Sequence, residues 1–277
     1  METPREPRIA ADKRADKDDD AIKETDHAFH TLVTDAPLGP RMNPFEDEPV
    51  TDPAGSRERA RAVASRLGEA ARAFNEAVVT SRADPEDIAD VTRSIIELTE
   101  RLRIPEPRSM LEPSEIEDHT RIHPLLSSVS GLAHPASVPL TSTLDSEGAL
   151  HARGRLGARF EGPPGKLHGG WVCAVFDEVL GALASIEHRI LTARLEVDFL
   201  APVPLDSEIL VVARIDRVEG RKVYLTAEMS CVDAPEDITS RARALMVRPR
   251  PGQAEEYFGE LAAVPRTGHP GAAVARG

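Results

Sequence analysis

The chain has 277 residues, a length that suits one or two domains. Its formal net charge of −13 argues against a nucleic-acid partner, because phosphate binding needs a basic face. Two cysteines, Cys173 and Cys231, are too few for a disulfide framework or a cysteine metal cluster. The sequence shows no leader and no apolar run of the roughly 18 residues that a membrane span needs, so a cytoplasmic location is expected.

Residues 1–50 are rich in charged residues and proline and contain few large apolar side chains. Acidic runs such as residues 16–20 cannot bury enough surface to offset the conformational entropy of the chain. We therefore expect a disordered tail over residues 1–50. A second, flexible tail is expected over residues 251–277.

Two helices are expected over residues 51–108. In the first, apolar residues recur at spacings of three and four from Val63 onward. The second opens with Asp84 as its cap and Pro85 at its first helical position, and Pro105 ends it. The short turn between them predicts an antiparallel helical hairpin. Each helix has one apolar seam, which needs a partner in another subunit or in the domain downstream.

A further domain is expected over residues 120–250, in which the apolar pattern changes from about Pro135 to the period of two that is typical of strands. Two strand-like runs come first, a long apolar helix follows, and four more runs complete the region. The six runs are 138–144, 150–160, 190–200, 208–218, 222–232 and 238–247. This order predicts an α+β fold in which an antiparallel sheet wraps around one central helix.

The helix that begins near His168 is apolar along one broad face, which we assign to the core. The residues of this face are Val172, Val175, Phe176, Val179, Leu180, Leu183 and Ile186. Asp177 lies off its edge, on a side with small residues, and Glu178 lies on the other flank. A charge is costly to bury in so apolar a helix, so we expect Asp177 to have a function.

Gly169 and Gly170 stand at the start of this helix, where backbone amides have no partner within the helix. Such amides can polarise a carbonyl oxygen, and a carboxylate two turns along can act as a base or a nucleophile. The pattern alone leaves a plainer interpretation open, in which the glycines form a tight turn and Asp177 is a solvated helix residue.

The run FEGPPGKLHGG over residues 160–170, with Asp177 nine positions after His168, resembles the hotdog-fold thioesterases. The similarity is greatest to the branch related to the phenylacetic-acid-degradation (PaaI-like) thioesterases. Residues 191–205 and 219–222 match further, and the resemblance covers residues 125–249. It implies the hotdog fold, in which an antiparallel sheet wraps one long helix.

The resemblance also implies hydrolysis of an acyl-CoA thioester by a homodimer or a dimer of dimers, with the active site at the subunit interface. The amide of Gly169 or Gly170 would hold the thioester oxygen, and His168 would shape the pocket or contact the thioester. Asp177 of the facing subunit would activate water or attack the thioester carbon. Thr192 would orient the water, although an ordinary strand threonine is the plainer interpretation.

Coenzyme A enters only as part of the substrate, and we expect no other cofactor and no metal, because the histidines lack metal-ligand spacing. In so acidic a chain the CoA phosphates would need local basic residues. The candidates are Arg221, Lys222, Arg241 and Arg243. Trp171 is a candidate for lining the entrance of the acyl or pantetheine group, and plain packing would equally explain it.

One position departs from the family pattern. Some branches carry Asn or Gln six residues before the histidine, where this chain has Gly162, so carbonyl polarisation would depend more on backbone amides. A non-catalytic hotdog protein that binds acyl-CoA as a sensor or scaffold is the alternative function, and the presence of Asp177 favours the enzyme. A hotdog hydratase is disfavoured, because its Asp and His pair is not found after Asp177.

Overall fold

The computed structural model describes residues 53–103, 122–186, 189–250 and 252–259. The tail predicted over residues 1–50 lies outside these ranges. Of the tail predicted over residues 251–277, the described part contains the short helix α5 (Ala254–Phe258). Helix α2 and the sheet domain belong to one compact unit, whereas helix α3 belongs to a second.

Helices α2 (Pro53–Thr80) and α3 (Pro85–Leu102) lie where the sequence predicts helices. The Asp84 side chain caps α3, because its Oδ1 accepts hydrogen bonds from the amides of Glu86 (3.0 Å) and Asp87 (2.9 Å). The antiparallel hairpin stays a prediction, since the two helices belong to different units.

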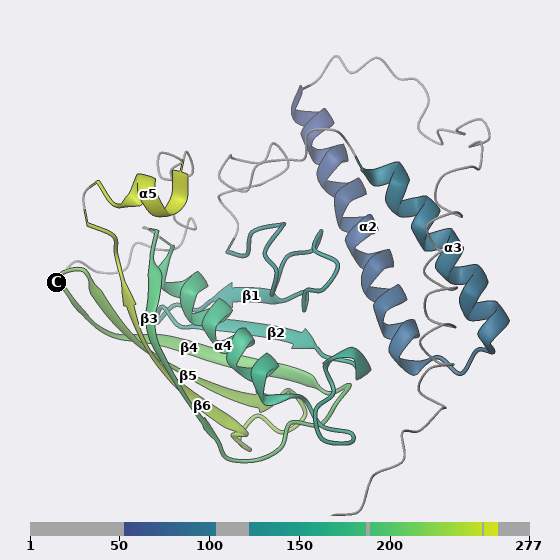
Figure 1. Ribbon diagram of the computed structural model, residues 1–277. Coiled ribbons are helices and arrows are strands. Elements are labelled where there is room, and N and C mark those ends of the chain that lie inside the picture. Colours follow the sequence, from purple (N-terminus) through teal and green to yellow (C-terminus); the bar gives the residue numbers. More distant parts are fainter. Residues whose placement is uncertain (1–52, 104–121, 187–188, 251, 260–277) are drawn as a thin grey trace, which may run out of the picture. The chain divides into compact units, whose positions relative to one another are not determined.

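Six antiparallel strands form one sheet in the order β1-β2-β4-β5-β6-β3 (Figure 1). They are β1 (Thr141–Leu144), β2 (Leu150–Arg155), β3 (Leu191–Phe199), β4 (Glu208–Glu219), β5 (Lys222–Cys231) and β6 (Ser240–Val247). The second predicted run is too long, because the chain leaves the sheet after Arg155 and forms the 3₁₀ helix η1 (Ala158–Phe160). The predicted order of strands and helix is confirmed.

Helix α4 (Gly169–Ala184) crosses the concave face of this sheet (Figure 1). Its predicted core face is confirmed, because the residues from Val172 to Leu183 on that face are buried and Ile186 is half-buried against the same core. Alternate residues of β4, β5 and β6 are buried against it. Each large apolar side chain buried in this way contributes about 1.5–3 kcal/mol. The packing therefore fixes which flank of α4 each polar residue occupies.

Helix α2 is fastened to the sheet domain by two charged side chains. The Arg72 guanidinium donates from Nη1 to the carbonyl oxygens of Leu132 (2.7 Å) and His134 (2.9 Å). The Glu76 carboxylate accepts a hydrogen bond from the amide of Ala158 at the start of η1. These contacts join a polar face of α2 to the downstream domain. The predicted apolar seam of α2 is not the face that packs there, because Val63, Leu67 and Phe74 are 41%, 51% and 37% exposed.

Candidate active site

Strand β3 runs antiparallel to α4, and each of its ends lies beside one part of the predicted site. At its start, the Thr192 hydroxyl donates a hydrogen bond to Asp177 Oδ1 over 2.8 Å. At its end, a Cβ added to Gly169 would lie 3.4 Å from the Phe199 ring. The structure therefore brings Thr192 to Asp177, and Phe199 to the helix start.

Thr192 faces the helix because β3 contains a β-bulge. Thr192 pairs with Met246, and Leu195 pairs with Ala244, so both β3 residues share the buried face of β6. Residues three positions apart cannot face the same side of a regular strand, because side chains alternate with a period of two. The register shifts directly after Thr192, where Ala193 is the additional residue. This shift turns the Thr192 hydroxyl toward Asp177.

Asp177 and Thr192 border a pocket of about 210 Å³ between α4, the start of β3 and the segment 122–130. Its lining residues are Ile122, Pro124, Ser127, Asp177, Glu178, Gly181, Ala182, Ser185, Ile190 and Thr192. Asp177 is half-buried there. One carboxylate therefore adjoins a space that can hold a small ligand.

The start of α4 distinguishes the two predicted amide donors. His168 is the N-cap residue, and its Nδ1 accepts a hydrogen bond from the Gly170 amide over 2.9 Å. Within the described residues nothing accepts a hydrogen bond from the Gly169 amide. The positive end of the helix dipole adds to its attraction for a ligand oxygen. Gly169 therefore presents the free donor, and His168 serves to cap the helix.

Gly169 and Asp177 do not come together within one chain. They are eight residues apart on the same helix. At 1.5 Å per residue this separation is about 12 Å, too far for both to contact one thioester group. A site that uses both groups therefore requires two copies of the chain.

The sequence analysis missed a buried cluster around Glu178. This side chain is 18% exposed, and its Oε1 accepts hydrogen bonds from the hydroxyls of Ser127 (2.9 Å) and Ser130. His123 lies between Glu178 and β1, with Nδ1 3.5 Å from Glu178 Oε1 and Nε2 2.7 Å from Ser142 Oγ. Burial favours a higher pKa for the Glu178 carboxyl, but hydrogen bonds from His123 and Ser130 hold that pKa below its ordinary value.

No spacing signal links these residues, since Ser127 and Glu178 are 51 positions apart in the chain. Helical periodicity predicts only that Glu178 lies on the side of the apolar face away from Asp177. The cluster depends on the path of the segment 122–130, which has little regular secondary structure.

Trp171 packs on the core. Its ring meets Phe160 edge to face, with centroids 4.6 Å apart and planes at 75°. Packing explains its position, and a contact with substrate stays a prediction. Cys173 is half-buried near it on the helix, and burial raises the pKa of its thiol, which suits a packing role.

Arg221 and Lys222 lie on the exposed turn between β4 and β5. The Arg221 guanidinium donates to the carbonyl oxygen of Arg248 over 2.8 Å. Lys222 pairs with Val247, which in turn pairs with Leu191 at the start of β3. The turn therefore lies at the Asp177 end of the sheet and away from Gly169 of the same chain.

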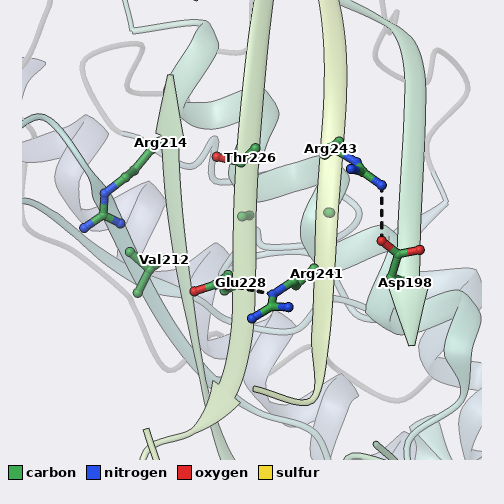
Figure 2. A pocket seen from close by; sticks show the side chains of 9 residues that line it. Asp198, Val212, Arg214, Thr226, Glu228, Arg241 and Arg243 are labelled. Atoms are coloured by element: carbon green, nitrogen blue, oxygen red, sulfur yellow. Dashed lines mark hydrogen bonds and ion pairs between the residues drawn. The ribbon is translucent and has the colours of Figure 1, made fainter. Parts of the chain in front are cut away.

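Arg241 and Arg243 lie on the outer face of the sheet, around a hollow of about 360 Å³ (Figure 2). Arg241 donates from Nε to Glu228 over 2.8 Å, and Arg243 Nη2 lies 3.4 Å from Asp198 Oδ2. Exposed pairs of this kind contribute little to stability. Both arginines already have carboxylate partners, so they are weaker candidates for the CoA phosphates than Arg221 and Lys222.

Among the described residues, no group of three or more His, Cys, Asp or Glu side chains is placed to hold a metal ion. None of the described helices combines the length and the apolar character that crossing a membrane requires.

The sheet, its strand order and the single enclosed helix define a hotdog domain. A crystal structure of a thioesterase superfamily protein has the same fold, with a TM-score of 0.51 at 20% identity, and the match covers 73% of this chain and 97% of that one. Residues 164–236 match the thioesterase superfamily. The chain therefore has the hotdog fold, and residues 164–236 of it are similar to that superfamily.

Similarity to curated proteins covers a shorter stretch. Acyl-coenzyme A thioesterase THEM4 of Rattus norvegicus is 30% identical over 92 residues, which are 33% of this chain and 40% of that protein. Its counterpart in Bos taurus is 34% identical over 92 residues, which are 33% of this chain and 38% of that protein. The chain thus spans less than half the length of these relatives.

Proposed function

We propose that this protein hydrolyses the thioester of an acyl-CoA to a free acid and CoA, at a site that two copies of the chain share. The observation that carries this proposal is the hydrogen bond from Thr192 to Asp177 Oδ1 at the edge of the pocket. Among the described residues nothing holds Asp177 Oδ2, so this oxygen is available to a water molecule or to the substrate. The similarity to two acyl-coenzyme A thioesterases supports the same chemistry.

A thioester carbonyl is electrophilic, so one carboxylate and one oxyanion donor suffice. Asp177 takes a proton from water while the water oxygen bonds to the carbonyl carbon. The C–S bond then breaks, and the CoA sulfur leaves with that proton. In the alternative route the Asp177 carboxylate attacks the carbon itself, the C–S bond breaks and CoA leaves as the thiolate. Water then hydrolyses the resulting anhydride, which releases the free acid and restores Asp177. A placed base contributes about 10² to 10⁴ in rate, and one oxyanion donor about 2.7–4 kcal/mol.

The second copy would supply the oxyanion donor. Strand β3 pairs with β6 along one edge, and within the described residues its other edge has no strand partner. Antiparallel pairing of two β3 strands about a two-fold axis between Leu195 and Glu196 would place Phe199 of one copy opposite Thr192 of the other. Because Phe199 adjoins Gly169 and Thr192 adjoins Asp177, this pairing would bring a free amide to the partner's carboxylate. A dimer, or a dimer of dimers, would satisfy this requirement.

Arg221 and Lys222 would contact the phosphates of CoA, because both are exposed at the Asp177 end of the sheet. Their double substitution by alanine is expected to raise KM for acyl-CoA and to leave kcat unchanged. The same variant should weaken the dependence of KM on salt concentration.

Thiol release from a series of acyl-CoAs, from acetyl-CoA to palmitoyl-CoA, tests the activity of the full chain. The wild type should release CoA, and Asp177→Ala should not. Tight binding of acyl-CoA with no thiol release at any chain length would instead indicate the sensor or scaffold.

Mixing two inactive variants tests the shared site. Asp177→Asn and Gly169→Pro each damage both sites of their own dimer. A mixed dimer, however, contains one site with an intact Gly169 from one copy and an intact Asp177 from the other. Activity should therefore return when the two are unfolded, mixed and refolded together. Failure to return, with mixed dimers present, would show that the site lies within one chain.

A further inference from the structure

The pocket beside Asp177 has room for only one part of an acyl-CoA, if the proposed function is correct. With the carbonyl carbon at Asp177, either the acyl group or the CoA group must occupy the volume of about 210 Å³. CoA, with its nucleotide and pantetheine arm, is far too large. The acyl group therefore enters the pocket, and CoA extends to solvent.

One wall of this pocket is the segment 122–130, which contributes Ile122, Pro124 and Ser127. Ile190, directly before β3, and Gly181 of α4 are among the residues that complete the pocket. Backbone hydrogen bonds, such as that from the Val138 amide to the Val129 carbonyl oxygen (2.6 Å), tie the segment to residues 131–138. Polar side-chain contacts also join it to α4.

Glu178 supplies most of these contacts. The Ser127 hydroxyl accepts hydrogen bonds from the amides of Val129 (3.3 Å) and Ser130 (3.2 Å), which closes a tight turn, and it donates to Glu178. The Ser130 hydroxyl donates to the same oxygen, and Ser130 is only 2% exposed. His123 adds a third contact from the same segment. One carboxylate of α4 thus fastens both ends of the wall.

We propose that Glu178 is a positioning residue that sets the longest acyl group the enzyme accepts, because it holds the segment 122–130 as a wall of the acyl pocket. An apolar cavity of about 150 Å³ holds benzene. The present pocket is somewhat larger, at about 210 Å³, and polar side chains such as Ser127 and Thr192 share its lining, so it suits short and medium acyl groups. Short and medium acyl-CoAs are the substrate class that follows.

Gly181 indicates that the pocket is kept open from the helix side as well. A Cβ at this position would meet only Met246 Cε, at the ordinary contact distance of 3.8 Å, and the backbone is not left-handed. Neither packing nor conformation requires glycine here, although glycine inside a helix costs about 0.5–1 kcal/mol relative to alanine. The space above Gly181 is therefore available to the acyl group.

Values of kcat/KM for acetyl-, hexanoyl-, octanoyl- and dodecanoyl-CoA in the full chain test this proposal. Gly181→Val should lower kcat/KM for octanoyl-CoA relative to acetyl-CoA by about tenfold or more, the effect of a misfitting methylene group. Glu178→Ala and Ser130→Ala should have the opposite effect, because the wall is no longer held in place. The value of kcat/KM for dodecanoyl-CoA should rise relative to that for acetyl-CoA. Glu178→Gln, which keeps an acceptor for the serines, should restore much of the wild-type profile.

Ser137→Ala is the matched control. Ser137 is a buried serine that donates to the carbonyl oxygens of Gly131 (2.5 Å) and His134 (3.1 Å) and has no bond to Glu178. Loss of the Ser137 hydroxyl should lower the free energy of unfolding without changing how kcat/KM depends on acyl chain length. If the wild type hydrolyses acyl-CoA but Gly181→Val and Ser130→Ala keep its profile, the wall proposal is wrong. If the wild type hydrolyses none, the proposed function itself is wrong.

Discussion

Asp177 and Glu178 are consecutive residues of α4, yet the two flanks of the helix give them opposite surroundings. Asp177 is half-buried and receives one hydrogen bond, from Thr192, on one of its two oxygens. Glu178 is more deeply buried, and Ser127 and Ser130 both donate to one of its oxygens. A carboxylate that is partly exposed and accepts a single hydrogen bond can exchange protons, whereas a more deeply buried carboxylate that accepts several hydrogen bonds stabilises structure. Surroundings, rather than residue type, separate the two roles.

The largest expected effect comes from Asp177→Asn, which removes the charge and keeps the shape. We expect kcat for acyl-CoA hydrolysis to fall by about 10² to 10⁴, because a placed base is lost. The free energy of unfolding should change by less than about 0.5 kcal/mol, as for other substitutions outside the core. Thiol-release kinetics and urea unfolding measure the two quantities. Wild-type kcat in this variant would remove Asp177 from the mechanism.

The free amide at the other end of α4 can be removed without breaking the helix. Gly169→Pro replaces the first helical residue, where proline is tolerated, and His168 before it already has an extended backbone (φ −66°, ψ 131°). We expect kcat to fall by about 10² to 10³, the effect of one oxyanion donor. Gly169→Ala keeps the amide and serves as the control. Similar kcat values for the two variants would argue against Gly169 as the donor.

Glu178→Ala should lower the free energy of unfolding. It leaves the hydroxyls of Ser127 and Ser130 without their acceptor, and each buried polar group left unpaired costs about 1–3 kcal/mol. We expect a loss of about 3 kcal/mol in the free energy of unfolding, measured with urea, while kcat for acetyl-CoA stays near that of the wild type. Unchanged stability would show that the cluster is not held through Glu178.

Thr192→Val removes the hydroxyl beside Asp177 and keeps a branched side chain in β3. A hydrogen bond to a charged group contributes about 1.5–3 kcal/mol, so kcat should fall by at least about tenfold while KM changes little. Steady-state kinetics with acetyl-CoA measure this split. A change confined to KM would assign Thr192 to substrate binding instead.

The smallest effect expected is on the pH dependence of stability. The folded-state pKa of Glu178 lies below its ordinary value of 4.5, so the unfolded chain binds more protons at this site than the folded chain in acid. Its stabilising contribution is present above the unfolded-state pKa and is lost as pH falls through the folded-state pKa. Unfolding free energies measured in this acid range should fall more steeply for the wild type than for Glu178→Gln. Parallel curves would contradict the lowered pKa.

Local signals in the sequence predicted much of this fold and part of the site. The spacing of apolar residues in α4 depends only on helical periodicity, and it placed Val175 in the core and Asp177 beside it correctly. Alternation likewise located the strands, because each buries one face against the helix. Structural features that depend on residues close in the sequence could therefore be predicted.

Structural features that depend on contacts between residues far apart in the sequence could not be predicted. The inward orientation of Thr192 depends on a one-residue bulge at Ala193, and strict alternation would have pointed its hydroxyl outward. The preference for Gly169 over Gly170 follows from the rotamer of His168. The role of Glu178 depends on a segment about fifty residues earlier. No periodicity carries such information.

The docking of α2 decides where this chain can be cut. A fragment that starts at residue 122 would lack Arg72 and Glu76, which pair with the carbonyl of Leu132 and the amide of Ala158. Their removal would leave both backbone groups without these hydrogen bonds, and Ala158 lies just ahead of the loop that leads into α4. The smallest fragment expected to retain the site therefore begins at or before Pro53.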